Sequence, residues 1–400
     1  MSHLFMELGA TLAVVYAGGR AVEAIGKPHF LGEIGAGILV GPAVLDLVSP
    51  TGAVHVFASI GAASLFFHVG YADVDVGGLL RVGRSSLAVA AFGMVIPFVA
   101  GIGTGLAFGY PPAGTMFLAL ALSITSIAIT VRTLDHLGAA ETTLADKLVG
   151  AAIVDDVAGM IAFSVLLLGT AGATSLTGSS VGWLLVRVAG FFAVAAVVHF
   201  FVADLLFARV PASDRSEGVF LVFGALLTLF AAAAEFAELH AAFGAFVAGL
   251  VAGHGDRAAD QEYEQGVSAI TFGVFAPVFF ATIGMRLEFE AMTAVDPLLI
   301  VIPVVGIGTK IVGGYLGNRL VGGSTAESAM VGVGMVPRTG VELVIVSVAF
   351  TRDFVDQQIY GAFVGLVVVS VLLTPLLLER VGGDRLTECD SAHTDSDPDT

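Results

Sequence analysis

The sequence predicts an all-α, polytopic membrane protein with about thirteen transmembrane helices. Of its 400 residues, 56% are hydrophobic and only 13% are charged, and the mean hydropathy is +0.94. A water-soluble globular chain carries about 25% charged residues. The 51 glycines fit the same class, because helices that pack closely inside lipid need small residues where they touch. The pairs Gly37/Gly41 and Gly313/Gly317 have the spacing of such contacts.

Hydropathy places the individual spans, since roughly 20 apolar residues are needed to cross a bilayer. The predicted spans are residues 4–25, 29–45, 53–72, 85–108, 113–131, 149–168, 181–207, 219–236, 240–253, 267–285, 297–316, 329–350 and 358–378. The loops between them are short, which predicts no domain outside the membrane.

Basic residues are distributed unevenly between the two sets of alternating loops. One set holds Arg20, Lys27, Arg81, Arg84, Arg132, Lys147, Arg209, Arg215, Arg257, Arg319, Arg380 and Arg385. The other set holds only Arg286 and Arg352. Because positive residues stay cytoplasmic, we expect a multi-pass protein of the cell membrane with its N-terminus outside and its C-terminus inside.

The charge is strongly acidic, with a formal net value of −17. Residues 386–400 contain five acids and no base. An acidic exterior keeps a protein soluble where salt screens charge, which points to a halophilic prokaryote; a disordered acidic tail is the alternative reading. Nucleic acid is excluded as a partner, because it requires a basic face. The single cysteine, Cys389, rules out an internal disulfide.

Two adjacent carboxylates, Asp155 and Asp156, lie near the middle of the span 149–168. A charge at that depth costs at least about 2.5–3.5 kcal/mol, so such residues are rare and usually functional. Two neighbouring carboxylates titrate as a coupled pair. We therefore expect a site where a cation and a proton compete for a carboxylate, although a helix–helix ion pair is the structural alternative.

Lys310, in the span 297–316, is the natural counter-charge for one of these aspartates. At about 4 Å and an effective dielectric constant of about 20, a Lys–Asp pair gains about 4 kcal/mol. A purely structural pair is the alternative interpretation.

Two spans contain residues that interrupt a helix. Proline removes a backbone donor and glycine permits unwinding. Non-helical backbone at membrane depth must line a cavity or be buried in protein, and paired interruptions in two halves of a chain mark the binding site of a transporter. The spans run in opposite directions, as inverted repeats require. The residues concerned are Ser123, Thr125, Ser126 and Thr130 in the span 113–131, and Pro337, Arg338, Thr339 and Gly340 in the span 329–350.

Side chains near the interruptions supply candidate ligands and supports. Thr125 and Ser126 offer hydroxyl and carbonyl oxygens to a hard cation, or else bond back to their own helix. Arg338 and Glu342 are four residues apart and are expected to pair on one helical face, supporting the broken helix together with Pro337 and Gly340. No phosphate loop, nucleophile elbow or metal-ligand spacing stands out, so neither a cofactor nor an enzymatic activity is expected.

These residues resemble the monovalent cation:proton antiporters, in the second branch, which includes bacterial Na+/H+ antiporters and Kef-type potassium efflux proteins. The double aspartate followed by a mid-membrane lysine is the specific part of the likeness. The matching stretches are LGEIGAGILVGPAVL (31–45), LFFHVGYADVD (65–75), ALSITSIAITVRTLDHLG (121–138), VGAAIVDDVAGM (149–160), HAAFGAFVAGLVAG (240–253), APVFFATIGMRLE (276–288) and GMVPRTGVELVIVSVA (334–349).

The resemblance implies a homodimeric exchanger with the NhaA-like antiporter fold, in which two broken helices cross within inverted repeats. It implies that Asp156 binds Na+ or a proton, that Asp155 pairs with Lys310, and that Thr125 and Ser126 line the crossing. Asp155, Asp156 and Thr125 would then be the ligands of the transported Na+. An Asp–Asp pair implies electrogenic exchange, with more protons than cations moved.

By the same resemblance, the core transport domain comprises residues 81–170 and 291–380, and the dimerisation domain residues 1–80 and 216–290. Residues 171–215 form a linker helix, and residues 381–400 are an acidic tail expected to be disordered.

The predicted function is exchange of cytoplasmic Na+, or Li+, for external H+. K+/H+ exchange or Kef-like K+ efflux is the alternative, and Na+-coupled solute symport is a third class. The chain departs from the family in two places. Thr339 and Gly340 replace the usual Gly-Glu after Pro-Arg, with Glu342 two positions later, and only a short tail follows the last span, which weighs against ligand-gated K+ efflux.

Overall fold

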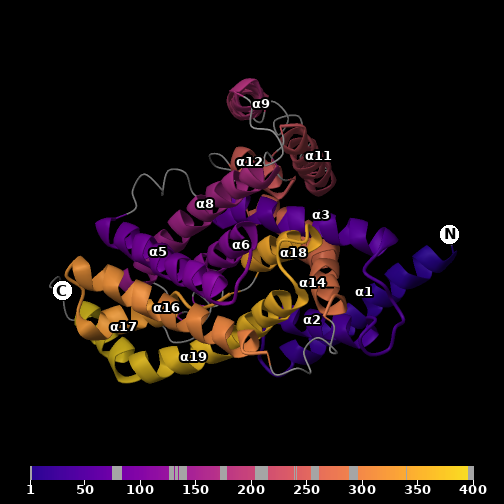
Figure 1. The fold of residues 1–400 in the computed structure, drawn as a ribbon. Helices are drawn as coiled ribbons and strands as arrows, with labels where there is room; N and C mark the ends of the chain where they lie inside the picture. The colour runs from indigo at the N-terminus through magenta and orange to yellow at the C-terminus, as the bar shows by residue number, and fades with distance from the viewer. Residues whose placement is uncertain are drawn as a thin grey trace. The chain divides into compact units, whose positions relative to one another are not determined.

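The computed structural model describes residues 2–73, 83–125, 130, 134, 142–171, 178–202, 215–237, 239, 241–253, 261–287, 296–338 and 340–394. Every regular element in these ranges is a helix (Figure 1), which confirms the predicted all-α class. In chain order the elements are α1 (Ser2–Glu23), α2 (His29–Val40), α3 (Gly52–His68), η1 (Val69–Asp73), α5 (Arg84–Ala107), α6 (Pro112–Ser123), α8 (Thr143–Ala171), α9 (Gly178–Val197), η2 (Val198–Val202), α11 (Arg215–Phe236), α12 (Ala241–Ala252), α13 (Gln261–Ile270), η5 (Thr271–Phe275), α14 (Ala276–Met285), α16 (Leu298–Leu320), α17 (Thr325–Gly334), α18 (Val341–Thr351) and α19 (Gln357–Thr394).

Six helical segments of the described chain are long and apolar enough to cross a membrane, and several shorter apolar helices accompany them. The multi-pass architecture is therefore confirmed. The six are Gly52–Tyr71, Arg84–Ala107, Thr143–Leu167, Gln265–Met285, Leu298–Leu320 and Gln357–Gly382. The span predicted at 29–45 is helical only to Val40, because Pro42 disfavours helical geometry at the residue before it and Gly41 is extended, with ψ of 176°.

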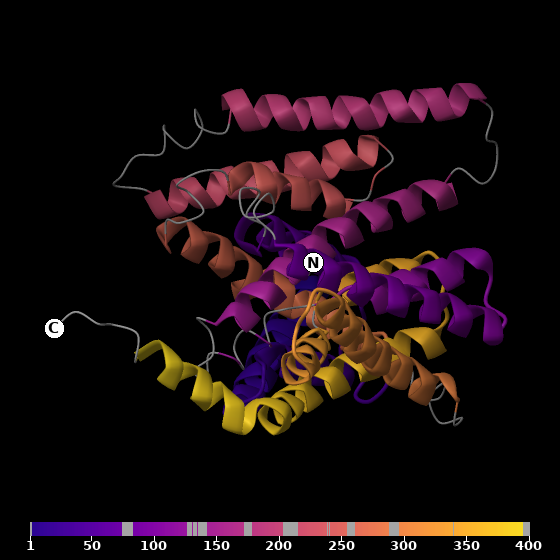
Figure 2. The same ribbon diagram turned by 90° about the vertical axis from the view of Figure 1, so that its left-hand side faces the viewer.

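The acidic tail differs from its prediction. Residues 381–394 were expected to be disordered, yet α19 continues as a helix to Thr394, and Figure 2 shows its yellow end extending toward the C-terminus. The physical reason is that extending an existing helix costs far less than nucleating a new one. After Pro375, the next proline that would stop the helix is Pro398.

The chain divides into two compact units. Unit 1 comprises residues Met1–Val76 and Met160–Glu290, and unit 2 comprises Gly77–Gly159 and Ala291–Thr400. Helix α8 contributes its first part to unit 2 and its second part to unit 1.

Within unit 1, helices meet backbone to backbone at glycines. A Cβ added to Gly37 of α2 would lie 1.9 Å from the carbonyl oxygen of Ala281 in α14. A Cβ on Gly61 of α3 would lie 2.2 Å from the Phe275 oxygen. These positions therefore require glycine, and the packing role expected for Gly37 is confirmed.

Within unit 2, α16 is held on two sides. Gly313 faces the Phe92 carbonyl oxygen of α5, where an added Cβ would lie 2.5 Å away, and Gly317 meets Ala88 in the same manner. On its other side, a Cβ added to Gly314 would lie 2.9 Å from the Gly332 Cα of α17. Helices α16, α17 and α19 are mutual neighbours, as Figure 1 shows. This close packing fixes the position of the helix that carries Lys310.

Both predicted interruptions are present in unit 2. Helix α6 ends at Ser123, and Ile124 is extended with ψ of 148°. Helix α17 ends at Gly334, and α18 begins at Val341 after a segment that contains Pro337. The prediction of two broken spans is therefore confirmed.

Candidate functional site

The two adjacent aspartates lie on α8, within its unit 2 part. Asp155 is fully buried and Asp156 is 7% exposed. Because neighbouring residues of an α-helix point about 100° apart, the two carboxylates face different surroundings.

Lys310 of α16 forms a buried ion pair with Asp155. Its Nζ lies 3.1 Å from Asp155 Oδ2, and both side chains are inaccessible to solvent. The same Nζ also donates a hydrogen bond to the carbonyl oxygen of Ser123, the last residue of α6. The other carboxylate oxygen, Asp155 Oδ1, has no hydrogen-bond partner in the described part of the chain. One oxygen of Asp155 is thus held by the lysine, while the other is available for a further ligand.

Arg338 occupies the interruption between α17 and α18 and is also fully buried. Its Nη1 donates to the Ala121 carbonyl oxygen at 2.8 Å, and its Nη2 donates to the Leu122 oxygen at 2.6 Å. The last carbonyls of a helix have no partner within the helix and carry partial negative charge. Arg338 and Lys310 together therefore cap the C-terminal end of α6 with two positive charges.

The two broken spans cap one another. The hydroxyl of Thr130, which follows the end of α6 in sequence, donates to the carbonyl oxygen of Gly334 at 2.6 Å, at the end of α17. In the opposite direction Arg338, which follows the end of α17, caps α6. These reciprocal hydrogen bonds satisfy carbonyl groups at the ends of α6 and α17, which explains how non-helical backbone is tolerated inside the protein core.

Arg338 and Glu342 were expected to pair on one helical face, but they do not lie on the same helix, because α18 begins only at Val341. Arg338 precedes α18 and uses its guanidinium on the carbonyls of α6, because the helix is broken between the two residues. Glu342 is fully buried in the first turn of α18, where a helix N-terminus favours a negative charge. It remains near enough to Arg338 for their charges to attract.

Five charged side chains are buried among the described residues of unit 2, namely Asp155, Asp156, Lys310, Arg338 and Glu342. Three of these are acids and two are bases, and Asp155 is paired with Lys310. The described part of the site is therefore rich in buried carboxylates, which are groups that a proton or a monovalent cation can bind.

Thr125 lies two residues beyond the end of α6 and is fully buried. Within the described residues its Oγ1 has no hydrogen-bond partner, so this oxygen is available to a ligand. Pro337 lies in the interruption, and Gly340 directly precedes α18. Ser126 lies outside the described residues. The roles expected for these residues stay predictions.

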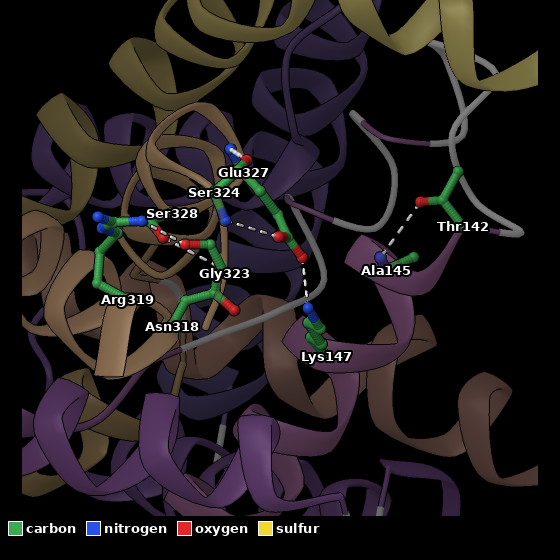
Figure 3. Close-up of polar contacts among 9 residues, drawn as sticks. All are labelled: Thr142, Ala145, Lys147, Asn318, Arg319, Gly323, Ser324, Glu327 and Ser328. Atoms are coloured by element: carbon green, nitrogen blue, oxygen red, sulfur yellow. Dashed lines mark hydrogen bonds and ion pairs between the residues drawn. The ribbon is translucent and has the colours of Figure 1, made fainter. Parts of the chain in front are cut away.

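A further polar contact that was not predicted from the sequence joins α8 to α17. Figure 3 shows Lys147, in the first turns of α8, pointing toward Glu327 in the first turn of α17, where the two form a hydrogen-bonded ion pair. Partial burial alone would raise the pKa of the Glu327 carboxyl, but hydrogen bonding and the charge of Lys147, with further hydrogen bonds from Ser324 and Asn318, hold that pKa below its ordinary value. The S-x-x-E pattern of residues 324–327 is a readable helix-start signal, but nothing in it identifies Lys147 as a partner.

Comparisons with known proteins agree on one family. Residues 9–381 match the family described as "Sodium/hydrogen exchanger, transmembrane". The chain is 32% identical to the probable Na+/H+ antiporter GerT of Bacillus cereus, over 94% of this chain and 98% of that protein. It is 30% identical to the Na+/H+-K+ antiporter GerN of the same organism, over 95% and 96% of the two chains. The solved structure of the sodium proton antiporter MjNhaP1 from Methanocaldococcus jannaschii has the same fold, with a TM-score of 0.64, 16% identity and coverage of 96% and 98%.

Proposed function

Because this chain belongs to the family of transmembrane sodium/hydrogen exchangers, we propose that it is a secondary active antiporter that exchanges cytoplasmic Na+, or Li+, for external H+. The observation that carries the proposal is the pair of adjacent buried carboxylates, Asp155 and Asp156, of which Asp155 is bound to Lys310 through one oxygen only.

Buried carboxylates favour the binding of a positive charge. An ionised carboxylate in a low-dielectric interior is costly, so a proton or a cation bound at Asp155 or Asp156 lowers that cost. A proton supplies one positive charge, and so does a monovalent cation such as Na+, Li+ or K+.

The ligands that we propose for Na+ are oxygens, as a hard cation prefers. They are the carboxylate of Asp156, the Oδ1 atom of Asp155 and the hydroxyl of Thr125. The last two are buried atoms without a hydrogen-bond partner in the described chain. Ser126 is a further candidate from the same interruption.

Lys310 is proposed to couple the two ions electrically. When Na+ is bound at Asp155, the cation competes with Lys310 for that carboxylate, and the lysine can give up a proton. Exchange would then move more protons than Na+ ions, and each net charge is worth about 2.3 kcal/mol per 100 mV of membrane potential.

The remaining expectations belong to the same proposal. Residues 81–170 and 291–380 would be the core transport domain, residues 1–80 and 216–290 would be the dimerisation domain of a homodimer, and residues 171–215 would link the two. The protein would lie in the cell membrane with its N-terminus outside and its C-terminus in the cytoplasm, as the distribution of Lys and Arg favours. The acidic, lysine-poor composition supports a halophilic source.

Proteoliposomes test the function. With an imposed pH gradient, adding Na+ or Li+ should dissipate that gradient, adding choline should not, and the rate should respond to an imposed membrane potential. K+ belongs in the panel, because the relative GerN is named for Na+ and K+ together. A gradient that survives every monovalent cation would refute exchange, and proton movement that requires an organic solute would make the protein a symporter.

A further inference from the structure

The ion pair between Lys147 and Glu327 joins the two helices that build the site, at their ends away from it. Helix α8 carries Lys147 and, eight residues later, Asp155, which is about 12 Å along a helix. Helix α17 carries Glu327 in its first turn and leads into the interruption that holds Arg338. A contact between these ends therefore acts on the site through both helices.

Glu327 is held rigidly before it meets Lys147. The Ser324 backbone N–H donates to Glu327 Oε2 at 3.4 Å, and the Glu327 N–H donates to Ser324 Oγ at 3.1 Å, as Figure 3 shows. The neighbouring residue Ser328 is held as well, because the fully buried Asn318 donates a hydrogen bond to its Oγ at 3.1 Å. Because these hydrogen bonds already hold the Glu327 side chain, forming the ion pair with Lys147 costs little further conformational entropy. The pair should therefore be stronger than an ion pair between two mobile surface side chains.

The other contacts described between the two helices are apolar and do not depend on the orientation of particular atoms. Leu148 and Ala151 of α8 share a buried cluster with Val331 of α17 and with Met335, which directly follows α17. Gly334, the last residue of α17, fits against the methyl groups of Leu148. Apolar contacts are non-directional, and within lipid they have no hydrophobic driving force that would select one register.

We propose that Lys147 and Glu327 are positioning residues that fix α17 against α8 and thereby set the affinity of the site for Na+. The pair touches neither transported ion. It determines where the end of α17, and with it Arg338 and the capped end of α6, lies relative to Asp155 and Asp156. This inference rests on the proposed exchange and adds to it two residues remote from the aspartates.

The test compares the Na+ dependence of exchange in variants reconstituted in liposomes. Glu327→Gln and Lys147→Gln should each raise the KM for Na+ about three- to tenfold, with turnover at saturating Na+ within about twofold of wild type. The charge-swapped double variant, Lys147→Glu with Glu327→Lys, should return the KM toward the wild-type value. Glu23→Gln is the matched control, because it removes the same charge from the exposed Arg20–Glu23 pair of unit 1 and should leave the KM unchanged.

An unchanged KM in both single variants would overturn the proposal, as would an equal rise in Glu23→Gln or a double variant no better than the single ones. If a single variant does not assemble, the swapped variant decides: a wild-type KM supports positioning and a raised KM refutes it. The absence of exchange by the wild-type protein would instead refute the proposed function.

Discussion

Replacing Asp156 by Asn is expected to reduce Na+-dependent proton movement to the leak of empty liposomes while the protein stays folded. The substitution removes one of two adjacent buried carboxylates and keeps the shape of the side chain. A neutral amide cannot bind and release the proton that exchange requires, so the variant should transport nothing. Because an amide still offers hydrogen-bonding atoms in the same place, we expect the melting temperature to stay close to that of the wild type.

Asp146→Asn is the matched control for this experiment. Asp146 is an exposed aspartate in the first turn of the same helix, so the variant should transport like wild type. Exchange retained by Asp156→Asn with an unaltered pH dependence would remove Asp156 from the site.

Replacing Lys310 by Ala is expected to cause the largest loss of stability. The change leaves the buried Asp155 without its cation and the Ser123 carbonyl without a donor. Breaking a buried ion pair by removing one partner costs about 3–5 kcal/mol. The melting temperature of the purified protein should fall clearly, and exchange should be lost.

A second substitution separates this charge effect from simple loss of packing. Asp155→Asn added to Lys310→Ala removes the orphaned charge, so the double variant should recover a large part of the lost melting temperature. A Lys310→Ala protein that melts like wild type, or a double variant that melts no higher than the single one, would show that the pair contributes no stability.

The ionisable residues of the site could be predicted from the sequence, because burying a charge in a membrane has a high free-energy cost. Asp155, Asp156 and Lys310 stand out because ionisable residues are rare inside a membrane, and the distances agree with a contact between two of them. The interruption at Pro337 was predictable because proline lacks a backbone N–H and glycine tolerates non-helical geometry, wherever they occur in a chain.

The hydrogen-bond partners of Arg338 could not be predicted from the sequence. Its guanidinium binds the carbonyls of Ala121 and Leu122, more than 200 positions away, and a backbone carbonyl leaves no trace in composition. An i, i+4 rule assumes an unbroken helix, so it placed Glu342 on the same face as Arg338, although α18 begins only at Val341.

The sequence did not show which glutamate accompanies the two aspartates. Glu33 and Glu342 are both buried, but Glu33 belongs to unit 1, whereas Glu342 belongs to unit 2 with Asp155 and Asp156. The extension of α19 to Thr394 shows the converse problem, since an acidic composition suggested disorder where the helix continues.

The pH dependence of Na+ affinity tests the central claim most directly. If Na+ and a proton compete for the same buried carboxylates, binding of Na+ must displace protons, and the apparent Na+ affinity must weaken as the solution is acidified. Below the pKa of the site, we expect the KM for Na+ to rise roughly tenfold per pH unit for each proton displaced. A KM that stays constant from pH 8 to pH 5, while transport continues, would mean that the two ions use separate sites.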